Sequence, residues 1–184
     1  LVADKRKRDE LDVSNHPLTR PAMIESEAIK RFSTIGAALD YPVHIVHVSS
    51  KEGLEEVVRE RNLGHKVTCE TCPQYLVLDE SRYTLPDFEG VKYVMSPPLR
   101  TIQDQMALKD ALVNGLFQTI GSDHCSFTFN DQKLKSRHDF TRIPGGIPGV
   151  EERGIIAYDV LVNQCNMSAV DFMKLVSENP AKLY

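Results

Sequence analysis

A strand pattern that runs directly into a helix pattern is the strongest constraint on the fold of this chain. Residues 43–48 read Val-His-Ile-Val-His-Val, a short segment rich in β-branched side chains, which is typical of a strand. Ser49-Ser50-Lys51-Glu52 follows at once, and its Ser-x-x-Glu spacing predicts a capping box that starts a helix. That helix should end at Gly64, because glycine tolerates the left-handed conformation of a C-terminal cap.

The same alternation recurs along the chain. Residues 67–72 and 117–121 have the pattern of two further strands, and a helix is predicted over 102–116 between them. Another helix is predicted over 21–39. Because parallel neighbours need a crossover that a helix usually fills, three such units predict an α/β fold with a parallel sheet. Both a barrel segment and an open doubly wound sheet fit this pattern. The apolar stripes of the two helices are Ile24, Ala28, Phe32, Ile35 and Leu39, and Ala107, Leu108, Ala111, Leu112 and Leu116.

The last third of the chain is expected to combine a long loop with two helices. Residues 124–154 show no clean period, and a stretch of this length inside a compact domain predicts a site-shaping loop with some local structure. Helices are predicted over 154–163 and 168–177. Ser168 and Asp171 have the spacing of an N-terminal cap for the second helix.

Composition excludes several classes of protein. The 184 residues fit one domain, 1–184, with 41% hydrophobic and 26% charged residues, which is ordinary for a globular protein. No apolar run approaches the roughly 20 residues of a membrane span, and a net charge of −4 gives no reason to expect nucleic-acid binding. Four cysteines are too sparse for a disulfide scaffold, and no signal peptide is recognised. A cytoplasmic protein is therefore expected.

Two residues at predicted strand ends have the chemistry of metal ligands. His47 lies at the C-terminal end of the first strand and Asp123 just beyond the end of the third. Sites in parallel α/β folds form outside the carboxyl ends of strands, and imidazole and carboxylate are both ligands of Zn²⁺. A metal-bound water would be a strong nucleophile near neutral pH. A histidine in a strand is more often a structural residue, and an aspartate after Gly-Ser more often belongs to a turn or cap, so position alone makes a metal site only one of two interpretations.

Cys69 and Cys72 form a single Cys-x-x-Cys pair. Such a pair can be half of a zinc knuckle or a redox centre, and His124 and Cys125 could in principle complete a zinc site. No second Cys-x-x-Cys is present. The favoured interpretation is a pair of buried strand cysteines, because free cysteine is among the most buried residue types.

Five motifs in one order resemble those of dihydropyrimidinases and D-hydantoinases, and the resemblance covers nearly the whole chain. Gln74, where allantoinases and dihydroorotases are expected to have histidine, makes the chain more similar to the hydantoinase branch. The motifs are Val46-His-Val-Ser49, Glu70-Thr-Cys-Pro-Gln-Tyr-Leu76, Ser96-Pro-Pro-Leu-Arg100, Gly121-Ser-Asp-His-Cys125 and Ile143-Pro-Gly-Gly-Ile-Pro-Gly-Val-Glu-Glu-Arg153.

The resemblance implies a metal-dependent hydrolase that opens cyclic amides to N-carbamoyl amino acids. The implied fold is a (β/α)8 TIM barrel holding two divalent metal ions, expected to be zinc. By this resemblance His47 binds one metal, and Asp123 binds the other and carries the catalytic proton. Ser96 matches a position that contacts the cyclic amide or imide substrate through its main chain. Gly145 stands where an asparagine is expected in a second substrate-binding position.

The resemblance also implies that the chain is a partial barrel. Its three strands match the sixth to eighth, and the paired histidines, the bridging lysine and another histidine ligand belong upstream of Leu1. The β-sandwich domain that the resemblance implies is likewise expected to lie outside residues 1–184. The chain is therefore expected to have an incomplete metal site, negligible activity alone, and a need for self-association or the missing portion. The parent is expected to be a homo-oligomer. The alternative functions are a non-catalytic scaffold relative that assembles with partners and a structural zinc module.

Overall fold

The computed structural model describes residues 1–184 and contains one three-stranded parallel sheet in the order β1-β2-β3. The strands are β1 (Val43–Ile45), β2 (Val67–Thr71) and β3 (Thr119–Ile120). Val43 is paired with Val67, and Glu70 with Thr119. The α/β fold and the parallel order predicted from the strand and helix alternation are confirmed.

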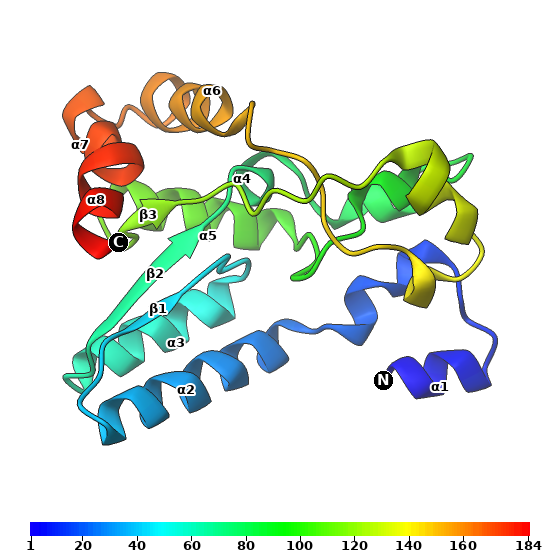
Figure 1. Cartoon of the computed structure of the whole chain (residues 1–184), viewed down its shortest axis with the longest axis horizontal. Helices are drawn as coiled ribbons and strands as arrows, with labels where there is room; N and C mark the ends of the chain where they lie inside the picture. The colour runs from blue at the N-terminus through cyan, green and yellow to red at the C-terminus, as the bar shows by residue number, and fades with distance from the viewer.

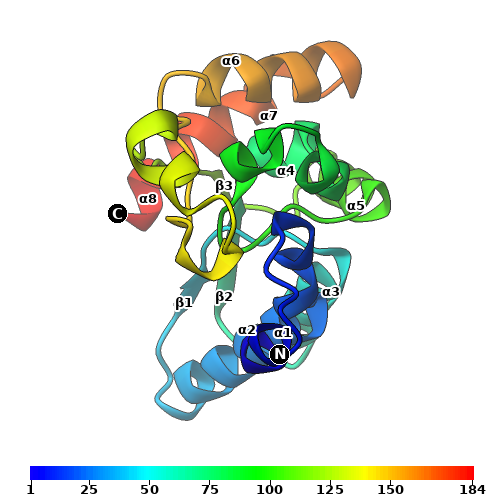
Figure 2. The same ribbon diagram turned by 90° about the vertical axis from the view of Figure 1, so that its right-hand side faces the viewer.

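Helices connect and flank the strands (Figure 1). Helix α2 packs against α3 and β1, whereas the C-terminal helical segment lies on the β3 side of the sheet, as both views show (Figure 2). The α-helices are α1 (Val2–Lys7), α2 (Ala22–Ala38), α3 (Lys51–Asn62), α4 (Gln74–Val77), α5 (Ile102–Val113), α6 (Arg153–Tyr158), α7 (Ala169–Met173) and α8 (Asn179–Leu183). Tighter or wider helical turns span Val13–Asn15, Pro17–Thr19, Glu80–Thr84, Glu89–Tyr93, Phe129–Lys133, Leu134–Ser136, Phe140–Arg142, Asp159–Gln164 and Lys174–Glu178.

The strands are shorter than the apolar patterns that predicted them. His47 has a left-handed backbone with φ of 45°, which ends β1 early. The chain then rejoins the sheet, since the Val48 amide donates to the Glu70 carbonyl at 2.8 Å. Hydrogen bonds on both sides of β3, from the Gln118 amide to Cys69 and from the Gly121 amide to Thr71, cover most of the predicted segment 117–121.

Helix α3 begins one residue later than the predicted capping box. Ser50, and not Ser49, is the N-cap, and its side chain accepts a hydrogen bond from the Gly53 amide at 3.0 Å. Ser49 instead donates through its amide and hydroxyl groups to Glu25 of α2. The predicted end is confirmed, because Gly64 adopts the left-handed conformation with φ of 85°. The Ser168 cap on Asp171 is confirmed as well, although that helical segment continues to Leu183.

The apolar stripe of α2 does not face the core. The buried residues of this helix are Ile29, Ser33 and Gly36, while Phe32 and Ile35 are 51% and 53% exposed. The reason is close packing at Gly36, where a Cβ atom would stand 2.5 Å from Cγ1 of Val43. The glycine lets β1 approach the helix on that side, which turns the larger apolar residues away.

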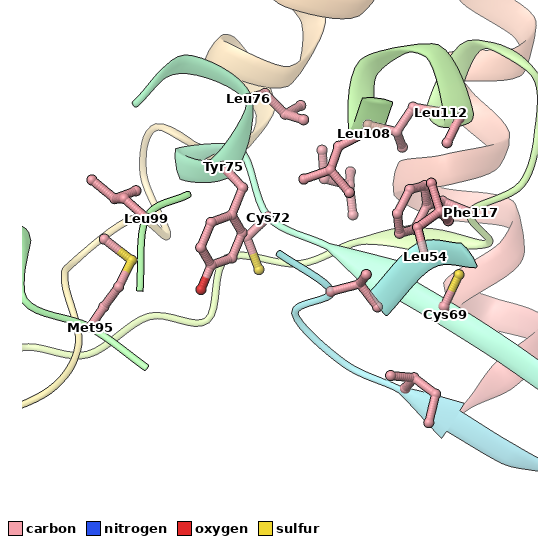
Figure 3. Close-up of a cluster of buried hydrophobic side chains, with 14 of the residues drawn as sticks. Leu54, Cys69, Cys72, Tyr75, Leu76, Met95, Leu99, Leu108, Leu112 and Phe117 are labelled. Atoms are coloured by element: carbon pink, nitrogen blue, oxygen red, sulfur yellow. The ribbon is translucent and has the colours of Figure 1, made fainter. Parts of the chain in front are cut away.

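The main core lies between β2, α3, α4 and α5 (Figure 3). Cys69, Leu54 and Phe117 gather at one end of the cluster, and Tyr75 and Leu99 lie at the other. As predicted, Leu108, Ala111 and Leu112 form the buried side of α5. No helix combines the length and apolar character that crossing a membrane requires.

Candidate functional site

His47 lies just beyond the carboxyl end of β1 and is the first of the predicted site residues along the chain. Left-handed backbone is uncommon outside glycine, and such strained positions cluster at functional sites. The flanking Val48 is fixed on both sides, because its carbonyl also accepts a hydrogen bond from the Thr71 hydroxyl at 2.7 Å. His47 is therefore a partly buried side chain on a well-anchored turn out of the sheet.

His47 and Ser96 both line one cavity of about 710 Å³. Helix α2 forms its apolar side through Ile24, Phe32 and Ile35. Its polar side includes groups from β1, from the turn after β1 and from segment 96–100, namely His44, His47, Ser96 and Arg100. The structure thus places one predicted metal ligand and one predicted substrate-binding residue in the same cavity, although they are 49 positions apart in the sequence.

Gly145 lies beside Ser96. A Cβ atom at position 145 would contact only the Ser96 hydroxyl oxygen, at 3.7 Å, which is ordinary van der Waals separation. The next residue, Gly146, donates its amide hydrogen to the Val94 carbonyl at 3.0 Å. The two predicted substrate-binding positions therefore belong to one local structure formed by segments 94–96 and 145–146.

Asp123 stands at the end of β3 and has a left-handed backbone with φ of 47°. Its side chain is exposed, and it is not among the residues that line the cavity of His47 and Ser96. The neighbouring His124 pairs with Ile147, and its Nδ1 accepts hydrogen bonds from the amides of Gly149 and Val150. The Asp123 motif is therefore bound to the loop that carries Gly145.

A buried charged network joins the His47 turn to the Ser96 segment. Glu25 of α2 accepts hydrogen bonds from Ser49, two residues after His47, and pairs with Arg100 at 3.0 Å. Arg100 also donates to the Ser49 hydroxyl at 3.1 Å. The side chains of Glu25 and Arg100 are only 11% and 9% exposed. Arg100 belongs to the motif at residues 96–100, but no local sequence pattern pairs it with Glu25, 75 positions away.

The Cys69 and Cys72 thiols are packed in the core. Both side chains are fully buried, and burial raises the pKa of Cys69 to about 11. Burial, with the negative charges of Glu70 and Asp123, also raises the pKa of Cys72. Because metal binding and disulfide exchange both need the thiolate, this environment favours the interpretation of structural cysteines.

The residues with metal-ligand chemistry lie apart from one another in this chain. No three His, Cys, Asp or Glu side chains come together in an arrangement that could hold an ion. His47 and Asp123 follow strands that are separated by β2 in the sheet. Each of the two predicted ligands therefore stands at the end of its own strand, with β2 between those strands.

The fold is that of part of the hydantoinases. A solved D-hydantoinase superposes on this chain with a TM-score of 0.97 at 41% identity. The match spans 100% of this chain and 40% of the D-hydantoinase chain. The dihydropyrimidinase from Brevibacillus agri superposes with a TM-score of 0.96 at 42% identity, covering 99% of this chain and 40% of its own.

Sequence relatives point to the same group. A D-hydantoinase of Ralstonia pickettii is 44% identical over 169 residues, and a dihydropyrimidinase of Arabidopsis thaliana is 38% identical over 170. Each match covers 92% of this chain but only 37% and 32% of the respective relative. No family model matches the chain. The chain belongs to the family of D-hydantoinases and dihydropyrimidinases, as its motifs predicted, and spans less than half the length of these relatives.

Proposed function

We propose that this chain forms part of an enzyme that hydrolyses cyclic amide bonds, opening dihydropyrimidines or hydantoins to N-carbamoyl amino acids. The observation that carries the proposal is the shared cavity of His47 and Ser96 in a chain 41% identical to a solved D-hydantoinase. Three parallel strands in chain order support their assignment to a (β/α)8 barrel, as its last three strands. The parent protein is proposed to be a homo-oligomer.

Within this enzyme the proposed roles differ among the site residues. His47 and Asp123 are proposed metal ligands whose partner ligands are supplied from outside these 184 residues, and the proposed cofactor is a pair of divalent ions, with zinc favoured. Such ions supply an activated water and stabilise the developing oxyanion. Asp123 holds the proton and delivers it to the leaving ring nitrogen, for which an exposed carboxylate at a strand end is suited. Ser96 and Gly145 position the ring amide.

Ring opening by the parent protein and by the 184-residue chain tests this proposal. The parent should hydrolyse hydantoin or dihydrouracil, and the isolated chain should show negligible turnover. Asp123→Asn in the parent should lower kcat by at least about 100-fold, the scale of general acid-base catalysis. His47→Ala removes a proposed metal ligand and should lower both the bound metal and kcat. His138→Ala and Asp131→Asn are matched controls at exposed positions and should keep the activity. A parent that binds no metal and opens neither ring would instead support the scaffold alternative.

A further inference from the structure

Ser96 lies in an irregular segment, 94–100, that runs between Glu89–Tyr93 and α5. Most of this segment is buried, yet Ser96 itself is exposed toward the cavity. A buried segment outside helices and sheets has main-chain carbonyls that must find hydrogen-bond donors elsewhere. The donors that this segment uses are therefore informative about what holds Ser96 in place.

Three side chains from distant parts of the sequence supply these donors. The Lys133 ammonium donates to the Val94 carbonyl at 2.7 Å, and Nε2 of His16 donates to the Met95 carbonyl at 2.7 Å. On the other side of Ser96, the Tyr75 hydroxyl donates to the Pro97 carbonyl at 2.8 Å. The carbonyls of the residues before and after Ser96 are thus each held by a buried side chain.

For two of the three donors, Lys133 and His16, burial makes the charged form of the side chain unfavourable. Burial lowers the pKa of Lys133 to about 8 and that of His16 to about 4. Lys133 is almost fully buried, and no carboxylate offsets the cost of burying its charge. An apolar side chain of similar length would fill this space without that cost. The presence of Lys133 at this position is explained if its hydrogen bond to the Val94 carbonyl helps to hold the site in place.

We propose that Lys133, His16 and Tyr75 are positioning residues for substrate binding, which act by holding the main chain on both sides of Ser96. This inference rests on the proposed function. A cyclic amide or imide presents an N–H donor beside C=O acceptors, so its recognition by main-chain groups requires those groups to be fixed before binding. Hydrogen bonds to these carbonyls restrict the main-chain motion of segment 94–97 before the substrate arrives. Substrate binding then does not have to supply the entropy cost of ordering that segment.

Two variants remove one donor each and leave the apolar packing in place. Tyr75→Phe deletes the hydroxyl that reaches Pro97, and Lys133→Met deletes the ammonium that reaches Val94. Tyr83→Phe is the matched control, because Tyr83 is equally buried and its hydroxyl bonds the Leu99 amide and the Tyr93 carbonyl rather than the residues next to Ser96. Each variant is made in the parent enzyme and measured for kcat, KM and melting temperature.

Tyr75→Phe and Lys133→Met should raise KM for hydantoin or dihydrouracil about fivefold, the equivalent of one lost hydrogen bond, with a smaller change in kcat. Lys133→Met should do so with an unchanged or raised melting temperature, which a purely structural role would not produce. Tyr83→Phe should lower the melting temperature and keep KM. An unchanged KM in the first two variants, or an equal rise in the control, would overturn the inference.

Amide hydrogen exchange separates this inference from the proposed function. The Gly146 amide shares the Val94 carbonyl with Lys133, so Lys133→Met should speed exchange at Gly146, and Tyr83→Phe should not. A wild-type parent without ring hydrolysis would overturn the proposed function. Faster exchange at Gly146 would still support the positioning of segment 94–97, and unchanged exchange would refute it.

Discussion

Glu25 of α2 and Arg100 of the Ser96 segment form a buried ion pair with 3.0 Å between the guanidinium and carboxylate atoms. The same carboxylate accepts the Ser49 amide hydrogen at 2.8 Å, just after the His47 turn. One acidic side chain thus connects three segments that border the candidate site. The connection explains how a turn and an irregular segment keep a defined geometry without a strand between them.

Glu25→Gln should therefore be strongly destabilising. Loss of one partner leaves the Arg100 charge buried and unpaired, which costs about 3 kcal/mol in the free energy of unfolding. Glu27→Gln is the control in the same helix, because Glu27 pairs with Arg31 at 3.5 Å with both side chains at least 60% exposed. That substitution should change the free energy by less than about 0.5 kcal/mol. Urea unfolding followed by circular dichroism measures both, and equal effects would contradict the role assigned to the buried pair.

Acidification should destabilise the protein through His16. Arg20 donates to Nδ1 of this imidazole at 3.2 Å, so the neutral ring donates from Nε2 to Met95. Burial, aided by nearby Arg20, Lys133 and Arg100, lowers its pKa from 6.5 to about 4. Below pH 6.5 the unfolded state takes up the proton and the folded state does not. Stability is therefore present above pH 6.5 and falls toward pH 4, by up to about 3 kcal/mol.

Urea unfolding at several pH values between 4 and 7 checks this expectation. His16→Gln should flatten the pH dependence over that range, whereas His138→Gln, at an exposed position, should leave it unchanged. The same slope in wild type and His16→Gln would show that other groups cause the acid sensitivity.

Adjacent glycines should respond in opposite ways to an added side chain. Position 145 has room, since a Cβ atom would meet only Ser96 Oγ at 3.7 Å. Gly145→Asn should fold normally and lower KM in the parent enzyme by adding an amide beside Ser96. Gly146→Ala should be destabilising, because its φ is 141° and the Cβ atom would stand 2.5 Å from the Cys125 sulfur. Melting temperatures and steady-state kinetics test the pair, and a destabilised Gly145→Asn would refute it.

The exposed side of α2 should cause the isolated chain to self-associate. Ile24, Phe32 and Ile35 are each about half exposed in one continuous cavity wall beside β1, which is an edge strand of the sheet. Phe32→Glu should reduce the oligomeric mass seen in sedimentation velocity. Leu63→Glu, a similar substitution at an exposed position outside that wall, should not. A monodisperse wild-type monomer at micromolar concentration would contradict the expectation.

Local pattern was sufficient for much of the secondary structure and for the family. The strand and helix periods of residues 43–62 and 102–113, and the Gly64 cap, depend on neighbours within a few positions, so they can be recognised without the fold. The five motifs are likewise linear, and together they indicated the hydantoinase group that the comparisons confirm. The positions of His47 and Asp123 at strand ends follow from the same local reasoning.

The environment of each element and the pairing of the site residues depend instead on contacts made in the folded chain. The helical period of α2 defined an apolar face but not its environment, which depends on how closely Gly36 packs against Val43 of β1 in the folded chain. His47 and Ser96 share a cavity, and His16 and Lys133 hold Met95 and Val94, through separations of dozens of residues. No short-range pattern encodes such pairs, because burial and hydrogen-bond satisfaction are properties of the packed chain. Motif and period therefore predicted the residues of the candidate site, and packing decided which of them lie together.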